Sequence, residues 1–179
     1  MPEDIITQGI PHKKLAPLLE KLRKKVFKHK VVKDLLKKYD IDQAELDLVP
    51  VCFAKIPVSA RTDHGVIYIN IDLAKDGDFL DNDHYLAHEF THYCQQTTGS
   101  KPTPSATPEK YLDSPVEQEG FRNQTKYISD TKGDDVAEEY IDEVLDHHRK
   151  NDVDDKKRED RKDKLLAIAF AFGVKLDDE

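Results

Sequence analysis

The sequence contains only two cysteines, Cys52 and Cys94, in 179 residues. Two cysteines cannot form the disulfide framework of a small secreted domain. The N-terminus lacks the basic start and apolar core of a secretory signal. The longest nearly apolar run, LLAIAFAFGV near the C-terminus, is far shorter than the roughly 20 residues that cross a bilayer. We therefore expect a cytoplasmic, soluble protein with reduced thiols and no membrane contact.

Charged residues are abundant but unevenly distributed. They make up 36% of the chain, hydrophobic residues make up 37%, and the formal net charge is −8. Residues 11–39 carry eleven Lys or Arg against two acids, a local balance of +9 that leaves −17 for the rest of the chain. Such a basic helical arm could bind nucleic acid or an acidic partner. A solvated helix face is the simpler interpretation, and we favour it.

The N-terminal third has helical periodicity. Pro17 fits best in the first turn of the first helix. A second short helix is expected over VVKDLLKKY, residues 31–39. The apolar positions that recur at helical spacing in the first helix are Leu15, Leu18, Leu19, Leu22 and Val26.

Two strands are expected next, over LVPVCFAKI (48–56) and GVIYINIDL (65–73). In the second, Ile67, Ile69 and Ile71 alternate with Val, Tyr and Asn, which predicts one uniformly apolar face. The segment between them, PVSARTDHG, is typical of a turn-rich connection.

Two further helices follow the strands. The first contains HYLAHEFTHYCQQ, with Asp81 or Asp83 as its N-cap and its end near Gly99. A proline-containing loop then leads to a helix with Ser114 as cap and Pro115 in its first position. Beyond it we expect a helix after SDTKGDD, a charged connector, and a last short helix over LLAIAFAF.

Residues 88–92 read HEFTH, which is the H-E-x-x-H pattern. Positions four apart lie on one face of a helix, so His88 and His92 can share one metal ion. Zinc binds imidazole nitrogen and keeps a position for water in catalytic sites. Glu89 would lie beside the ion, where its carboxylate can take the proton of a zinc-activated water. The pattern predicts one zinc ion per chain.

Other side chains of this helix have structural explanations. Leu86, Phe90 and Tyr93 form the stripe that should be buried. His84 is four residues before the pattern, but its Cα lies about 12 Å along the axis from that of His92. We therefore place His84 outside the ligand set.

A catalytic zinc ion needs a further protein donor. The next helix offers Glu117 and Glu119, and the loop before it is long enough to reverse the chain. The two lie about 200° apart around a helix, so they cannot both face one ion. Ser114 and Glu117 also form S-x-x-E, a capping box, which is a purely structural explanation for that glutamate.

With these residues, the chain resembles a zincin metallopeptidase of the compact gluzincin type over roughly residues 50–128. In such groups a second helix supplies a glutamate within an E-x-x-A pattern, and EQEG is similar, with Gly120 in place of Ala. EGF resembles the N-E-G-F pattern of larger zinc aminopeptidases, in which the Glu before Gly is the ligand. We favour Glu117 as third ligand, with Glu119 as the alternative.

The resemblance implies an α+β, zincin-like fold. A small mixed or antiparallel sheet would pack on the active-site helix, followed by a glutamate-bearing helix and further helices. We expect a single domain over residues 1–179, with a basic helical N-terminal arm (1–48), a catalytic core (49–129) and a helical acidic C-terminal region (134–179). GVIYINI is the expected sheet edge for a substrate strand.

The resemblance also implies a zinc-dependent peptidase, of endopeptidase type, acting on a peptide or protein substrate. His88, His92 and Glu117 would hold the ion and Glu89 would be the general base. The alternative is a binding or scaffold protein with a zincin fold and a structural metal or none. Similar families use a His or Tyr after the glutamate helix to stabilise the oxyanion. The candidates are Tyr127, Tyr140, His147 and His148.

Overall fold

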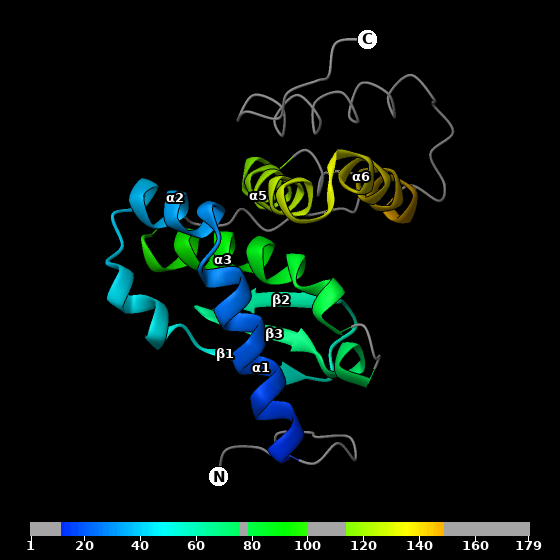
Figure 1. Ribbon diagram of the computed structural model, residues 1–179. Helices are drawn as coiled ribbons and strands as arrows, with labels where there is room; N and C mark the ends of the chain where they lie inside the picture. The colour runs from blue at the N-terminus through cyan, green and yellow to red at the C-terminus, as the bar shows by residue number, and fades with distance from the viewer. Residues whose placement is uncertain (1–11, 76–78, 100–113, 149–179) are drawn as a thin grey trace. The chain divides into compact units, whose positions relative to one another are not determined.

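The computed structural model describes residues 12–75, 79–99 and 114–148. The described residues form helices and a small three-stranded sheet, so the α+β class is confirmed. The chain divides into two compact units, residues 1–102 and 103–179 (Figure 1). The single-domain expectation stays a prediction. The proline-containing loop, the charged connector and the LLAIAFAF helix lie outside the described residues.

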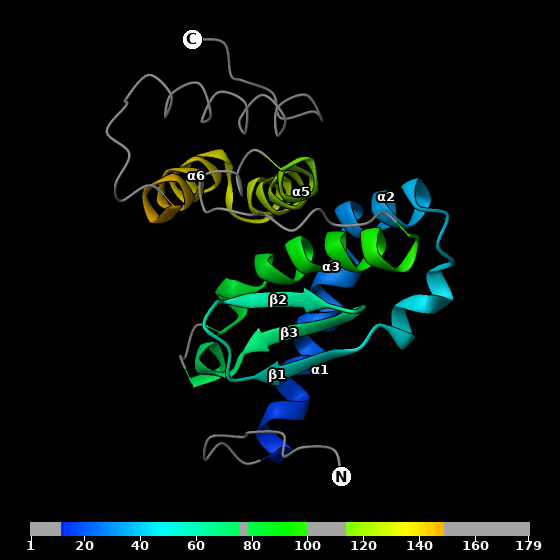
Figure 2. The ribbon, with the colours of Figure 1, turned by 180° about the vertical axis from the view of Figure 1, so that it is seen from behind.

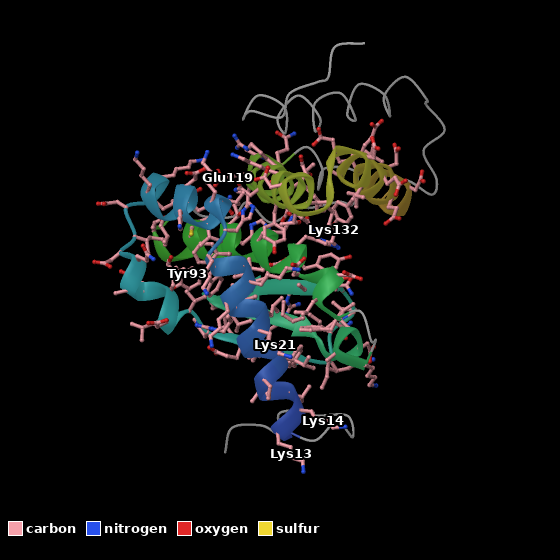
Figure 3. All side chains as sticks on the ribbon, in the orientation of Figure 1. Lys13, Lys14, Lys21, Tyr93, Glu119 and Lys132 are labelled. Atoms are coloured by element: carbon pink, nitrogen blue, oxygen red, sulfur yellow. The ribbon has the colours of Figure 1, made fainter. Side chains whose placement is uncertain are left out.

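Two amphipathic helices open the first unit, α1 (His12–Phe27) and α2 (Lys30–Lys38). Both contact the helix that carries the histidines, α3 (His84–Thr97). Lys13, Lys14 and Lys21 on α1 are exposed (Figure 3), which fits a solvated face as well as a binding surface, so the partner of the basic arm stays a prediction. The buried side chains of the two helices are Leu15, Leu22, Val26, Val31, Val32, Leu35 and Leu36.

The expected place of Pro17 was wrong. The first helix begins at His12, so Pro17 lies in its second turn. Proline has no N–H, and here that removes the helical bond to the carbonyl of Lys13. The helix begins earlier than predicted because Leu15, 4% exposed, packs in the core. This packing stabilises the first turn of the helix, which contains Leu15.

The sheet of the first unit is built from β1 (Val51–Ala54), β2 (Ala60–Asp63) and β3 (Val66–Asn70). The strand order is β1-β3-β2, with β1 parallel and β2 antiparallel to β3. Ile67 and Ile69 are buried, as their alternation predicts, and Ile71 is buried just beyond the strand.

Two expectations for the sheet were wrong. The segment predicted as a turn-rich connection contains β2, and GVIYINI is the central strand of the described sheet rather than an edge. The β2–β3 hairpin closes through His64 (φ 49°) and Gly65 (φ 75°), between the paired residues Asp63 and Val66. Positive φ at both loop positions is the type I′ geometry that matches the twist of paired strands.

Helix α3 contacts β2 and β3, and Figure 2 shows it running beside the sheet. In Figure 1, α1 crosses in front of the strands, and in Figure 2 it crosses behind them. Two short 3-10 helices, η2 (Ile71–Lys75) and η3 (Phe79–Asn82), precede α3, while η1 (Gln43–Leu48) precedes β1. Arg23 of α1 donates to the carbonyls of Leu46 (2.9 Å) and Val49 (2.6 Å), which ties α1 to the chain entering the sheet.

The ends of α3 are close to those predicted. Asp83 occupies the N-cap position, but its side chain makes no capping hydrogen bond. Its Oδ2 instead accepts from Lys25 Nζ at 2.8 Å, and the carboxylate is fully buried. The helix ends at Thr97, and Gly99 follows with φ 84°, the left-handed region that favours glycine.

The second unit contains α5 (Pro115–Lys132) and α6 (Asp134–His148), which form a helical hairpin through Gly133 at φ 102°. Ser114 is at the N-cap position and Pro115 opens α5, as predicted. Phe121 packs with Ile141, Val144 and Leu145 in the core of this unit. Among the described helices of the chain, none has both the length and the apolar character needed to cross a bilayer.

Candidate metal centre

His88 and His92 face each other on successive turns of α3. Their Nε2 atoms lie 3.0 Å apart and their ring centroids 4.8 Å apart, with the ring planes at 71°. Both rings are buried, at 5% and 7% exposure. The four-residue spacing and the helical backbone therefore bring two imidazole nitrogens to one point, as the sequence pattern predicts.

The second ring nitrogen of His92 is held by Gln95. His92 Nδ1 donates to Gln95 Oε1 at 2.8 Å, because an amide oxygen can only accept. A neutral ring with its proton on Nδ1 would present the lone pair of Nε2 to a metal ion. Metal-binding histidines are typically held in this way by a partner on the other nitrogen.

The donor set fits a zinc ion. Two nitrogens bound to one tetrahedral zinc at roughly 2.0–2.1 Å lie about 3.3 Å from each other. The Nε2 atoms of His88 and His92, at 3.0 Å, would need to separate by only a few tenths of an ångström. Neutral imidazole nitrogens and a carboxylate oxygen are also the ligands of catalytic zinc sites with three protein donors.

His88, His92 and Glu117 form a His-His-Glu group that could hold a metal ion. Glu117 is in the first turn of α5, in the second unit, so its role as a ligand is part of the proposal below. Glu119, on the same helix, is buried but is not a member of this group. The choice between the two glutamates stays a prediction.

Of the two hydrogen bonds that define a capping box, the one made by the Ser114 side chain is absent. Ser114 occupies the N-cap position of α5, but its side chain accepts no capping hydrogen bond. In a capping box this hydroxyl would bond to the N–H of Glu117, three residues on.

Glu89 follows His88 in sequence and is also buried, at 7% exposure. Its Oε2 accepts a hydrogen bond from Thr62 Oγ1 at 2.6 Å, and the same hydroxyl lies 3.0 Å from the backbone carbonyl oxygen of Glu89. Thr62 belongs to β2, so a residue of the sheet holds the carboxylate. Sequence reasoning missed Thr62, because the segment that contains it carries no strand pattern.

The side chains of α3 that were predicted to form a buried stripe are buried. Leu86 and Phe90 are fully buried, and Tyr93, labelled in Figure 3, is 9% exposed and stacks on Phe90 with ring centroids 5.7 Å apart. Burial also raises the pKa of Tyr93 above its ordinary range. His84 is not a member of the metal group; its ring packs beside that of Tyr85, with centroids 4.3 Å apart.

The oxyanion-donor candidates all lie in the second unit. Tyr127 is 1% exposed on α5. The hydroxyl oxygen of Tyr140, on α6, accepts from Gln124 Nε2 at 2.8 Å. His147 and His148 are in the last turn of α6, and their side chains are outside the described part of the chain. Their catalytic role stays a prediction.

Comparison of the chain with protein-family models, with curated proteins and with solved structures found no match. A functional assignment therefore depends on the chemistry of the His88, Glu89 and His92 cluster and on the side chains that hold it.

Proposed function

We propose that this chain is a zinc-dependent peptidase of the zincin type. His88, His92 and Glu117 would hold the ion, and Glu89 would act as general base. The observation that carries the proposal is the histidine pair on α3, with its Nε2 atoms 3.0 Å apart and Gln95 hydrogen-bonded to His92 Nδ1, next in sequence to the buried Glu89.

A bound zinc ion would supply a Lewis acid that acidifies water and polarises a carbonyl group. The chain supplies the proton transfers. Thr62 holds Oε2 of Glu89, which leaves Oε1 to take a proton from the attacking water and pass it to the nitrogen of the departing amine. Burial of Glu89 would keep bulk water from competing for that proton.

The sheet supports a peptide as substrate. Among the described strands, β2 is an edge strand, and it is the edge that contacts α3. An extended peptide can add to such an edge through backbone hydrogen bonds. We therefore assign the substrate-binding edge to β2 in place of GVIYINI. Pairing along a strand recognises an internal segment of a chain, which favours an endopeptidase.

The direct test compares Glu89→Gln with the wild-type chain. We expect about one zinc ion per chain in both proteins, measured by elemental analysis after dialysis. Cleavage of a mixture of unstructured fluorogenic peptides should fall by roughly 10²–10⁴-fold in the variant, because Gln cannot take a proton. Glu45→Gln, a change at an exposed glutamate of η1, is the matched control and should keep full activity. Retained proteolysis in Glu89→Gln would refute the mechanism.

One observation also fits the scaffold alternative. A 3.0 Å separation of two imidazole nitrogens is compatible with a direct hydrogen bond between His88 and His92 without an ion. A purified chain that binds no zinc after dialysis against the metal, and that cleaves no peptide, would favour this alternative.

A further inference from the structure

Thr62 and Glu89 are joined by a short hydrogen bond between the sheet and α3. The Oγ1–Oε2 distance is 2.6 Å, at the short end of the range for O–H···O hydrogen bonds. The backbone oxygen of Glu89 lies 3.0 Å from the same hydroxyl. A hydroxyl has one proton, and we assign it to the shorter of the two contacts, the one to Oε2.

The backbone of Thr62 is itself fixed to α3 by a second side chain. Gln96 Nε2 donates to the carbonyl oxygen of Thr62 at 3.1 Å, and Gln96 Oε1 accepts from the N–H of Gly65 at 2.9 Å. One amide therefore bonds both the strand and the hairpin turn. Gln96 is seven residues after Glu89, which places the two on the same side of α3.

The register of the hairpin explains why the carbonyl of Thr62 is accessible to Gln96. Asn70 N donates to Ser59 O at 2.9 Å, so Ser59 and Asn70 form a hydrogen-bonded pair. Hydrogen-bonded and non-hydrogen-bonded pairs alternate along antiparallel strands. Thr62, opposite Ile67, is then in a non-hydrogen-bonded pair, and its backbone groups point away from β3.

We propose that Thr62 is a positioning residue for Glu89, held in place by Gln96. This inference rests on the proposed function of Glu89 as general base. The three torsions of a glutamate side chain allow its carboxylate several orientations, whereas Thr62, anchored through its hydroxyl and its carbonyl, selects one of them. The hydrogen bond occupies Oε2 and leaves Oε1 as the oxygen that would take the proton.

The test uses the full chain with Thr62→Val, which keeps the shape of the side chain but removes the hydroxyl. We expect kcat to fall about 10- to 100-fold with KM little changed, since displacing a reacting group by about 1 Å costs up to roughly 10²-fold. Thr62→Ser restores the donor and should recover most of kcat. Thr98→Val, a change at an exposed threonine after the end of α3, should leave kcat unchanged.

A second readout does not depend on activity. In the metal-free chain labelled with ¹³C at glutamate carboxyl groups, the Glu89 resonance, assigned with Glu89→Gln, should shift in Thr62→Val and return toward its wild-type position in Thr62→Ser. An unchanged Glu89 resonance in folded Thr62→Val would overturn the proposal, as would wild-type kcat in that variant. If Glu89→Gln stays active, the proposed function fails; if it is inactive while Thr62→Val behaves as wild type, only the positioning role fails.

Discussion

His92 and Gln95 are bonded within a single turn of α3, with Nδ1 of the imidazole donating to Oε1 of the amide over 2.8 Å. Residues three apart on a helix are neighbours, so this contact needs no long-range packing to form. The bond orients the ring and favours the tautomer with its proton on Nδ1. His92 Nε2 lies 3.0 Å from His88 Nε2.

Replacing Gln95 with Leu should weaken zinc binding about 10- to 100-fold, the usual cost of losing the partner of a metal-binding histidine. Gln95→Glu keeps an acceptor for Nδ1–H and should bind zinc nearly as well as the wild-type chain. Competition with a chromogenic chelator measures both affinities. Gln43→Leu, at an exposed position of η1, is the control. Equal affinities of Gln95→Leu and wild type would show that this bond does not contribute to metal binding.

The same zinc-affinity assay decides which of the two candidate glutamates of α5 is the third ligand. Glu117 belongs to the His-His-Glu group that could hold a metal ion, and Glu119 does not. Glu117→Gln should therefore weaken zinc binding by more than the roughly 10- to 100-fold expected when a residue that only hydrogen-bonds to a metal ligand is lost. Glu119→Gln should bind zinc as the wild-type chain does. The opposite order would assign the third ligand to Glu119.

The parts of the site that were predictable from sequence are those set by one helix. A repeat of 3.6 residues per turn places His88, Glu89 and His92 relative to one another and identifies Leu86 and Phe90 as buried, without knowledge of the rest of the fold. The same periodicity separates His84 from the metal pair.

The contacts that were missed join segments distant in sequence. Ala60–Asp63 has no alternation of apolar residues, and these residues form a strand only because β3 and the I′ turn at His64–Gly65 pair them. The Thr62–Glu89 bond spans 27 positions and depends on that pairing, so no local pattern could indicate it. The sheet edge was predicted at GVIYINI for the same reason. Because β2 was not predicted, β3 had only one neighbouring strand and was predicted to be an edge.

The ion pair between Lys25 and Asp83 should matter for stability. Asp83 has no exposed side-chain surface, and its Oδ2 lies 2.8 Å from Lys25 Nζ. Lys25→Met leaves a buried carboxylate without this donor, and we expect it to lower the free energy of unfolding by about 1–3 kcal/mol. Urea denaturation measures the change.

Lys24, the next residue, provides the matched control. Its ammonium lies 3.5 Å from Glu20, and both side chains are well exposed, at 66% and 59%. Such surface pairs contribute roughly 0–1 kcal/mol, so Lys24→Met should be nearly neutral. Equal destabilisation by the two substitutions would contradict the importance of burial at Asp83.

The two free cysteines should differ in reactivity. Burial raises the pKa of the Cys52 thiol above its ordinary value of 9.0, and Cys94 is fully buried. A raised pKa lowers the thiolate fraction at any pH below it, so Cys52 in the folded chain should react slowly with iodoacetamide at about pH 8. The rate of alkylation of Cys52 should keep rising as the pH passes 9.0.

Mass spectrometry counts the alkylated cysteines. It should find one adduct on the folded chain, two after unfolding in guanidinium chloride, and none on folded Cys52→Ser. A Cys52 rate that levels off below the ordinary thiol pKa would show that burial does not govern this site.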